Sequence, residues 1–200
     1  MARDWDFDAG RLPLDFANTA EWHASHQPLE MLETYPDLVA WSEDAQLLNK
    51  SEANHLLVNA EAAPKDAAKA LKKVVAIRDV IYRIMSAIAT GETPRESDLN
   101  KFNIALTAGF KKTRISATSE GFEWTWDKSD QAFDQILWPV LRSTAELLTS
   151  QEIKQVGQCA DDRGCGYLFY DTSRNHSRRW CSMESCGNRA KAKRHYKRKK

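Results

Sequence analysis

The sequence lacks the features that mark several large classes of protein. None of its apolar runs approaches the ~20 residues that a membrane-spanning helix needs, so we expect no membrane association. The start, MARDWDFDAG, is acidic and has no apolar signal core, which predicts a protein of the reducing cytoplasm. A nucleophile elbow, a phosphate-binding glycine loop and an open-site metal motif are also missing. We therefore expect no enzyme and assign no catalytic residues.

Cysteine is scarce, and its placement is informative. The four cysteines form two short-spaced pairs, C-x5-C and C-x4-C, with fifteen residues between the pairs. Two such pairs are what a tetrahedral structural metal site requires. Four soft thiolates suit zinc, although an iron–sulfur cluster would use the same ligand type. The spacing predicts one structural Zn²⁺ held by Cys159, Cys165, Cys181 and Cys186.

The net charge of +1 conceals two oppositely charged regions. Residues 159–200 contain twelve Lys/Arg and four Asp/Glu, whereas residues 1–158 contain seventeen Lys/Arg and twenty-four Asp/Glu. A cationic end is suited to an anionic partner, and an acidic body would be repelled by the same partner. The charge division therefore favours nucleic acid as the partner of the C-terminal end.

The region before the cysteines shows mainly helical periodicity. Residues 10–20 favour a helix because Pro13 fits a first turn. A period of two over residues 113–126 predicts a β-hairpin, whose aromatic face is expected to pack on the helices because isolated hairpins are marginally stable. Further helices are expected over 35–48, from an N-cap at Ser51 to residue 60, over 64–90 with Gly91 as cap, over 94–109, and from Ser129 with a kink or break at Pro139.

Polar residues on the first helix allow two interpretations. Asp15, Asn18 and Thr19 can be ordinary polar positions, or they can line a ligand pocket near Trp22 and His23. Both interpretations stay open at this point. A small-molecule effector and a homodimer are accordingly the two roles considered for the N-terminal region. On the long helix, Arg78 and Arg83 are expected on the flanks, solvated or ion-paired.

The cysteine region has the layout of a treble-clef-like zinc finger. A β-type run at 166–171 lies between the two pairs, and a helix is expected directly after Cys186. That helix would direct the positive end of its dipole at the thiolates. We expect Trp180 to pack in the core of the finger, and we consider Asp171 as an ion-pair partner of Arg189. His176 and His195 are not needed as ligands because four cysteines complete the shell.

The C-terminal helix is basic on more than one face. Arg189, Lys193 and Lys197 share one face, and Arg194 lies on the neighbouring face together with Arg198. Like charges at this spacing destabilise a free helix, and neutralising them on phosphates releases counterions. The alternative is a basic tail that only aids solubility. The candidate nucleic-acid contacts are Arg178, Arg179, Arg189, Lys191, Lys193, Arg194, Lys197 and Arg198.

Two longer motifs carry a resemblance to known families. The stretch CGYLFYDTSRNHSRRWCSMESCGNRAKAKRHYKR resembles the CGNR-type zinc finger, and GRLPLDFANT with LRSTAELLTS resembles the ABATE-like domain that precedes this finger. The resemblance implies a bacterial, stress-induced transcription regulator that binds DNA. It also implies zinc on the four cysteines, with Gly187, Asn188 and Arg189 completing the signature.

The sequence thus predicts a mainly α (α+β) protein of two domains. Residues 1–152 form a helical ABATE-like domain with one β-hairpin, and residues 153–200 form the zinc finger with its basic helix. The predicted function is zinc-dependent, DNA-binding transcriptional regulation. The alternative is a module whose finger docks on a protein or on RNA. Thiol redox sensing is a further hypothesis, because oxidised cysteines would release zinc.

Overall fold

A computed structural model describes residues 5–126 and 132–198, with side chains up to Lys197 at the C-terminal end. The described part is mainly helical, and its strands form three two-stranded antiparallel sheets. The helices are α1 (Leu12–Ala17), α2 (Tyr35–Asp44), α3 (Lys50–Ala62), α4 (Pro64–Ala89), α5 (Glu96–Phe110), α6 (Leu137–Thr149) and α7 (Asn188–Arg198). The strands are β1 (Ala20–Glu21), β2 (Leu29–Glu30), β3 (Thr113–Thr118), β4 (Gly121–Trp126), β5 (Val156–Gln158) and β6 (Leu168–Tyr170). The predicted fold class, a helical domain followed by a zinc finger, is confirmed.

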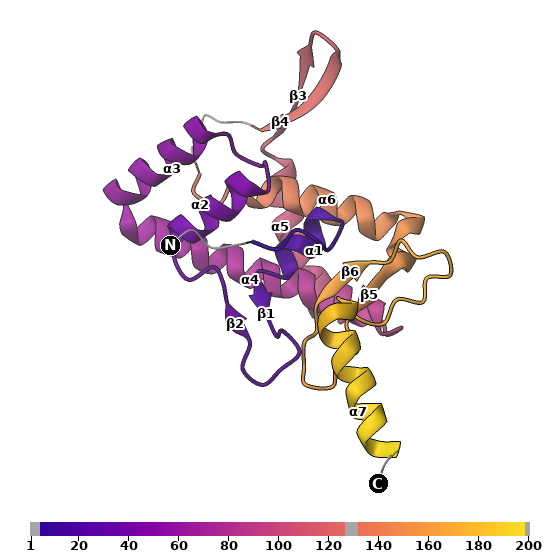
Figure 1. Cartoon of the computed structure of the whole chain (residues 1–200). Coiled ribbons are helices and arrows are strands. Elements are labelled where there is room, and N and C mark those ends of the chain that lie inside the picture. Colours follow the sequence, from indigo (N-terminus) through magenta and orange to yellow (C-terminus); the bar gives the residue numbers. More distant parts are fainter. Residues whose placement is uncertain (1–4, 127–131, 199–200) are drawn as a thin grey trace.

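Helix α4 is the element on which the body is assembled. Its apolar residues recur every three or four positions, and Val74, Ile81 and Ile84 are fully buried. It ends just before Gly91, whose φ of +79° supplies the left-handed cap that the sequence predicted. α1, α2, α3 and α5 pack against it, as do β5 and β6 (Figure 1). Among the described residues, no helix is long and apolar enough to cross a membrane.

Helices α2 and α3 each begin with a reciprocal capping box. The Thr34 hydroxyl accepts a bond from the backbone N–H of Asp37, whose carboxylate in turn accepts from the N–H of Thr34. Asn49 and Glu52 form the same pair at the start of α3. The predicted N-cap at Ser51 is therefore wrong by two residues, because the Asn49 side chain reaches the free N–H groups and Ser51 is already helical.

Pro139 lies in the first turn of α6. The helix begins at Leu137, so the missing N–H of Pro139 is one that would have had no partner within the helix. The predicted kink or break inside a longer helix is therefore wrong. The expected helix start at Ser129 lies outside the described residues.

The predicted hairpin is present as β3 and β4, but most of its aromatic face does not pack on the helices. Near its base, Trp126 lies 6.0 Å from Trp138 between ring centroids. Farther out, Ile115 is 62% exposed and Phe122 is 82% exposed. The hairpin projects away from the body, at the opposite end of the molecule from α7 (Figure 1). The expectation of a covered aromatic face is thus wrong beyond the base.

Strand β6, which lies between the two cysteine pairs, belongs to the core of the body. Leu168 is fully buried in the same core cluster as α1 and α4. The side-chain amide of Asn18 donates to Leu168 O at 2.8 Å, and its oxygen accepts from Leu168 N at 3.0 Å. The backbone N–H of Tyr170 donates to Ala9 O at 2.8 Å. The finger is therefore attached to the body along a strand and does not hang from a linker.

Candidate metal centre and nucleic-acid interface

The four thiols come together in one cluster. Their sulfur atoms all lie within 4.8 Å of one another, with 3.8 Å between Cys165 and Cys181 and 3.6 Å between Cys181 and Cys186. Four sulfurs placed about 2.3 Å from a tetrahedral zinc ion are about 3.8 Å apart, which matches these separations. A disulfide requires about 2.05 Å, and all four cysteines are free. The cluster therefore fits one Zn²⁺.

The first pair lies on the loop between β5 and β6. The N–H of Cys159 donates to Tyr167 O at 2.9 Å, which closes the loop. Gly166 has a φ of +64°, and a Cβ there would lie 2.5 Å from the hydroxyl oxygen of Tyr82. The predicted β-type run at 166–171 is confirmed as β6, but its partner is β5, which precedes the first cysteine. The loop of the β5–β6 hairpin thus contains Cys159 and Cys165.

The second pair leads directly into α7. Ser182 caps a π-helical turn, Met183–Gly187, which continues into α7 at Asn188. Arg189, one turn along, places Nη2 3.0 Å from Cys186 Sγ and Nε 3.5 Å from an Asp161 carboxylate oxygen. Asp161, and not Asp171 as considered from the sequence, is therefore the partner of Arg189.

Asp171 instead holds the loop before the second pair. Its carboxylate accepts backbone N–H bonds from Ser173 and Arg178, both at 2.8 Å. Burial alone would raise the pKa of Asp171, but these hydrogen bonds outweigh it and the pKa is lowered. His176 contacts the backbone oxygen of Asp171 through Nδ1 and takes no part in the thiol cluster.

The close approach of the sulfurs shifts the pKa values of the thiols in opposite directions. Contact with Cys165 and Cys181 lowers the pKa of Cys159, and contact with Cys159 raises the pKa of Cys165. A divalent cation at the centre would displace the remaining thiol protons and stabilise four thiolates at once. Arg163 lowers the pKa of Asp161, so this carboxylate stays ionised and holds Arg189 beside the sulfurs.

Three of the predicted nucleic-acid contacts are occupied within the finger. The guanidinium of Arg178 lies 4.3 Å from the centroid of the Phe169 ring and donates to the carbonyls of Trp180 and Cys181. Arg189 is held at the cluster, and Lys193 pairs with Asp162. These side chains fix the geometry of the finger.

The other predicted cations are exposed. Arg179, Lys191, Arg194 and Lys197 have no acidic partner among residues 5–126 and 132–197. A groove of about 450 Å³ runs between α7 and residues 160–163, and it is lined in part by Arg179, Arg194 and Lys197. Trp180 also lines this groove and is partly buried, with its ring against Gly187, so it packs within the finger as predicted but is not fully enclosed. The side chain of Arg198 lies outside the described part.

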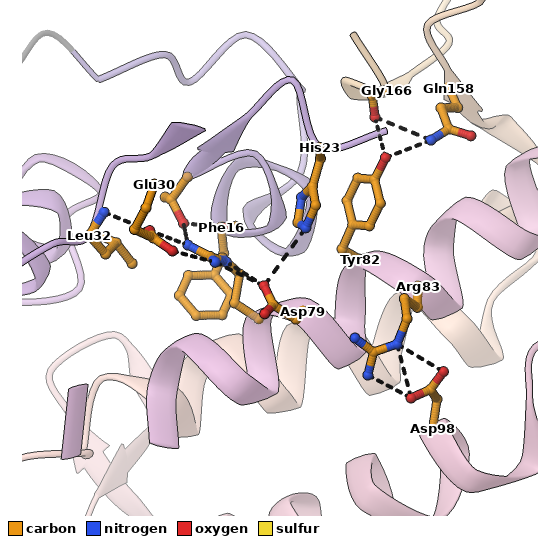
Figure 2. A network of polar contacts seen from close by, with 12 residues as sticks. Phe16, His23, Glu30, Leu32, Asp79, Tyr82, Arg83, Asp98, Gln158 and Gly166 are labelled. Atoms are coloured by element: carbon orange, nitrogen blue, oxygen red, sulfur yellow. Dashed lines mark hydrogen bonds and ion pairs between the residues drawn. The ribbon is translucent and has the colours of Figure 1, made fainter. Parts of the chain in front are cut away.

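A polar network connects the body with Gly166, the residue after Cys165 (Figure 2). The imidazole of His23 stacks on Tyr82 with 3.5 Å between ring centroids, and its Nε2 lies 3.7 Å from Asp79. The hydroxyl of Tyr82 donates to Gly166 O at 2.9 Å and accepts from Gln158 at 2.7 Å. The network reaches the residue next to Cys165, and sequence reasoning did not find it.

The network continues through Arg78, which is only 2% exposed. Its guanidinium pairs with Glu30 at 2.7 Å and with Asp79 at 2.8 Å. The expectation of a flank position is wrong for Arg78, although the expected ion pairing is present. The burial of Arg78 was predictable from the sequence, because Arg78 lies on the apolar stripe between Val74 and Ile81. Arg83 pairs with Asp98 at 2.7 Å, as expected for a flank residue.

The polar residues of α1 have different roles. Asn18 brackets β6, and the hydroxyl of Thr19 donates to Phe16 O. Asp15 is 8% exposed, and burial raises its pKa to about 6. All three line a cavity of about 330 Å³ between the body and the finger, together with Trp22. His23 is not among the lining residues, because it packs on Tyr82.

Comparison with known families gives two adjacent matches. Residues 10–151 match the ABATE family, described as "Putative stress-induced transcription regulator", and residues 155–199 match the CGNR zinc finger. No curated protein matches the chain. Both matched families are of the regulator and zinc-finger type and neither is an enzyme family. The zinc-finger match also selects zinc over an iron–sulfur cluster for the four thiols.

Proposed function

The chain belongs to the ABATE family and ends in a CGNR zinc finger, and from this premise we propose that it is a zinc-dependent, DNA-binding transcriptional regulator. Cys159, Cys165, Cys181 and Cys186 hold one structural zinc ion. Residues 1–152 form the regulatory domain and residues 153–200 the DNA-binding finger. The four reduced thiols suit a cytoplasmic protein.

One observation carries the proposal: the thiol cluster fixes the start of a basic helix whose other described contacts are ion pairs with Asp161 and Asp162. α7 begins two residues after Cys186 and extends away from the body (Figure 1). Its residues are almost all exposed. A helix this poor in apolar side chains gains nothing from packing, and its charges gain most from a polyanion.

The cations of the finger divide into a supporting group and a contacting group. Arg178 and Arg189 support the second pair of thiols. Lys191, Arg194 and Lys197 on α7 are the contacts for phosphate, with Arg179 across the groove. The acidic body carries seven more acidic than basic residues over 1–158, so it repels DNA and leaves the finger as the docking end. The N-terminal domain then senses a ligand or forms a dimer.

The test is binding of the zinc-loaded chain to a labelled random-sequence duplex, followed by fluorescence anisotropy over a range of salt concentrations. We expect binding at low salt that weakens steeply, with a slope of about 0.9 for each phosphate neutralised. Removing zinc with a chelator should abolish the binding, because α7 loses its fixed start. A zinc-loaded protein that fails to bind duplex DNA at low ionic strength would refute the proposal.

A matched pair of triple variants assigns the contact. Changing Lys191→Gln, Arg194→Gln and Lys197→Gln together should lower the salt slope by about 2–3. The control changes three exposed lysines of α4 in the same way, namely Lys65→Gln, Lys69→Gln and Lys72→Gln. The control should keep the salt slope of the unchanged chain and bind DNA only slightly more weakly, because it makes the distant body more acidic without removing a contact. Equal losses in both variants would show that overall charge, and not α7, determines binding.

A further inference from the structure

We propose that the cavity between α1 and the zinc finger binds a small organic cation, an amine or quaternary ammonium ion with an apolar body. This inference rests on the sensory role given above to the N-terminal domain, but it does not require that the finger bind DNA. The cavity has a volume of about 330 Å³, which is in the range of small-molecule sites. Residues of both the body and the finger form its wall, so a ligand bound there would contact both parts of the protein.

The body supplies the carboxylates of the cavity. Asp6, Asp15 and Glu21 line it, and no cation pairs with any of them among the described residues. Asp15 is the most buried of the three, and only its Oδ1 has a bond, from Ala9 N at 3.0 Å. The charges that act on Asp15 are those of Asp6 and Asp8, which are both negative. Arg189 of the finger also lines the cavity, but its guanidinium is held by Asp161 and by the Cys186 sulfur, so the three carboxylates have no paired cation among the described residues.

Aromatic rings form much of the remaining wall. Trp5, Trp22 and Trp41 line the cavity. Trp22 adopts a left-handed backbone conformation with a φ of +54°, which is unusual for a residue with a bulky side chain. Indole rings are the best partners for cations among aromatic side chains. Rings together with carboxylates form the type of enclosure that recognises ammonium groups, and the rings also accommodate an apolar body.

The finger supplies a buried hydroxyl to the wall of the cavity. Tyr167 lines the cavity, and burial together with the nearby Asp6 carboxylate raises the pKa of its hydroxyl. No described residue donates a hydrogen bond to the buried hydroxyl oxygen. An ammonium N–H could donate to this oxygen. The free acceptor, like the carboxylates, suits a ligand with hydrogen-bond donors.

Occupancy of the cavity would act directly on the metal centre. Cys165, Cys181 and Cys186 also line the cavity. A ligand in contact with both walls stabilises the arrangement in which the finger is docked. The zinc-thiolate cluster is itself anionic, so a bound cation would also reduce its net charge. Binding of a small cation would therefore stabilise the finger in its docked position.

The experiment uses the zinc-loaded full chain and four probes of similar size in calorimetric titrations. Benzylamine and benzyltrimethylammonium are the cations, benzyl alcohol is the neutral control and benzoate is the anionic control. We expect at least one cation to bind, with no binding of the alcohol or the anion. Equal binding of the alcohol, or no binding of either cation at millimolar concentration, would overturn the proposal. Because no DNA is present, failure here is separate from failure of DNA binding.

Two conservative variants locate the site. Asp15→Asn keeps the acceptor oxygen for Ala9 but removes the charge, and it should weaken cation binding about tenfold or more. Tyr167→Phe removes only the hydroxyl, and it should weaken the binding of benzylamine but leave the binding of benzyltrimethylammonium unchanged, because the latter has no N–H to donate. Asp44→Asn, at an exposed position on α2, is the control and should bind as the unchanged chain does. Unaltered binding in Asp15→Asn would place any cation site elsewhere and refute the assignment.

Discussion

The body and the finger are stabilised by different means, although they share a surface. The body has a continuous apolar core built around α4, with side chains such as Trp41 and Ile84 fully buried. The second half of the finger, residues 172–197, has few buried residues, among them Cys186 and Gly187. In the body, burial of apolar area stabilises the fold, whereas in the second half of the finger a metal must do so.

The boundary between these two regimes does not coincide with the start of the finger. β5 and β6 lie within the range matched by the zinc-finger family, yet Leu168 and Tyr170 belong to the core of the body. The finger therefore consists of a part stabilised by the core and a part stabilised by metal, with Cys159 and Cys165 between them. Loss of zinc should therefore unfold only the metal-stabilised part, which contains α7, and leave β5 and β6 folded on the body.

The largest expected effect separates these two parts. Cys186→Ser removes a buried ligand, and structural zinc contributes about 10–16 kcal/mol to the folding of small fingers. We expect loss of zinc, and loss of amide-exchange protection over residues 172–197, with protection of β6 and α4 retained. Ser177→Ala, at an exposed position in the same region, is the control and should keep zinc. Simultaneous loss of protection in α4 would show that body and finger form one cooperative unit.

The next effect tests whether β6 belongs to the body. Leu168→Ala should lower the free energy of unfolding of the body by about 2–5 kcal/mol, because it opens a cavity in the shared core. Chemical denaturation followed by far-ultraviolet circular dichroism measures the change. Phe122→Ala, on the exposed tip of the hairpin, should change it by less than about 0.5 kcal/mol. Comparable effects of the two changes would contradict the assignment of Leu168 to the core.

Sequence patterns predicted the elements whose stability is local. The stripe of α4, its Gly91 cap and the hairpin at 113–126 are confirmed because periodicity and turn residues fix them within a short stretch of chain. The cysteine spacing likewise predicted the metal cluster. The N-cap at Asn49 was missed because Ser51 and Asn49 are both good capping residues, and only the reciprocal bond with Glu52 distinguishes them.

Contacts between distant parts of the chain were out of reach of sequence reasoning. The pairing of β6 with β5, the bracket from Asn18 and the link from Tyr82 to Gly166 each join residues far apart in sequence. Several acidic residues of the sequence could pair with Arg189, and the turn at residues 160–163 determines that Asp161 is the partner. A single sequence does not determine such contacts. A ligand pocket at Asp15, Asn18 and Thr19 was therefore predicted only as an open alternative, and the part of the finger in its wall was not predicted.

The next prediction concerns Asp15, whose burial should lower the stability of the body at neutral pH, whereas the residues around it raise that stability. Burial raises the pKa of Asp15 from 3.8 to about 6, so the folded state binds the proton more tightly than the unfolded state does. The contribution of Asp15 to the free energy of unfolding is therefore most favourable below about pH 4. It is lost as the pH rises through about 6, where the folded protein releases the proton.

Asp15→Asn should remove that loss and raise the free energy of unfolding at pH 7 by about 1–2 kcal/mol, with little gain near pH 4. Urea denaturation at both pH values measures this difference, and Asp44→Asn is the matched control. A variant that is less stable than the unchanged chain at pH 7 would mean that the Asp15 charge is used to hold the fold, not to meet a ligand.

The smallest expected effects lie on the surface of the finger, where stability and binding respond differently. Lys193 pairs with Asp162 across the groove, and both side chains are more than half exposed. Lys193→Gln should therefore change the free energy of unfolding by no more than about 0.5 kcal/mol. Its effect on DNA binding should be larger than that of Lys191→Gln, because the unpaired carboxylate of Asp162 would then face the phosphates.

A double-mutant cycle resolves this last point. Asp162→Asn combined with Lys193→Gln should restore the affinity for duplex DNA to about that of the unchanged chain, because it removes one cation and one anion that already neutralise each other. The double variant should therefore bind more tightly than Lys191→Gln, which has lost a cation without an acidic partner. Anisotropy titrations at one fixed salt concentration measure the three variants side by side. If Lys193→Gln and the double variant bind equally, then Asp162 does not face the nucleic acid. In that case the contact surface is the opposite face of α7, where Lys191 lies outside the groove.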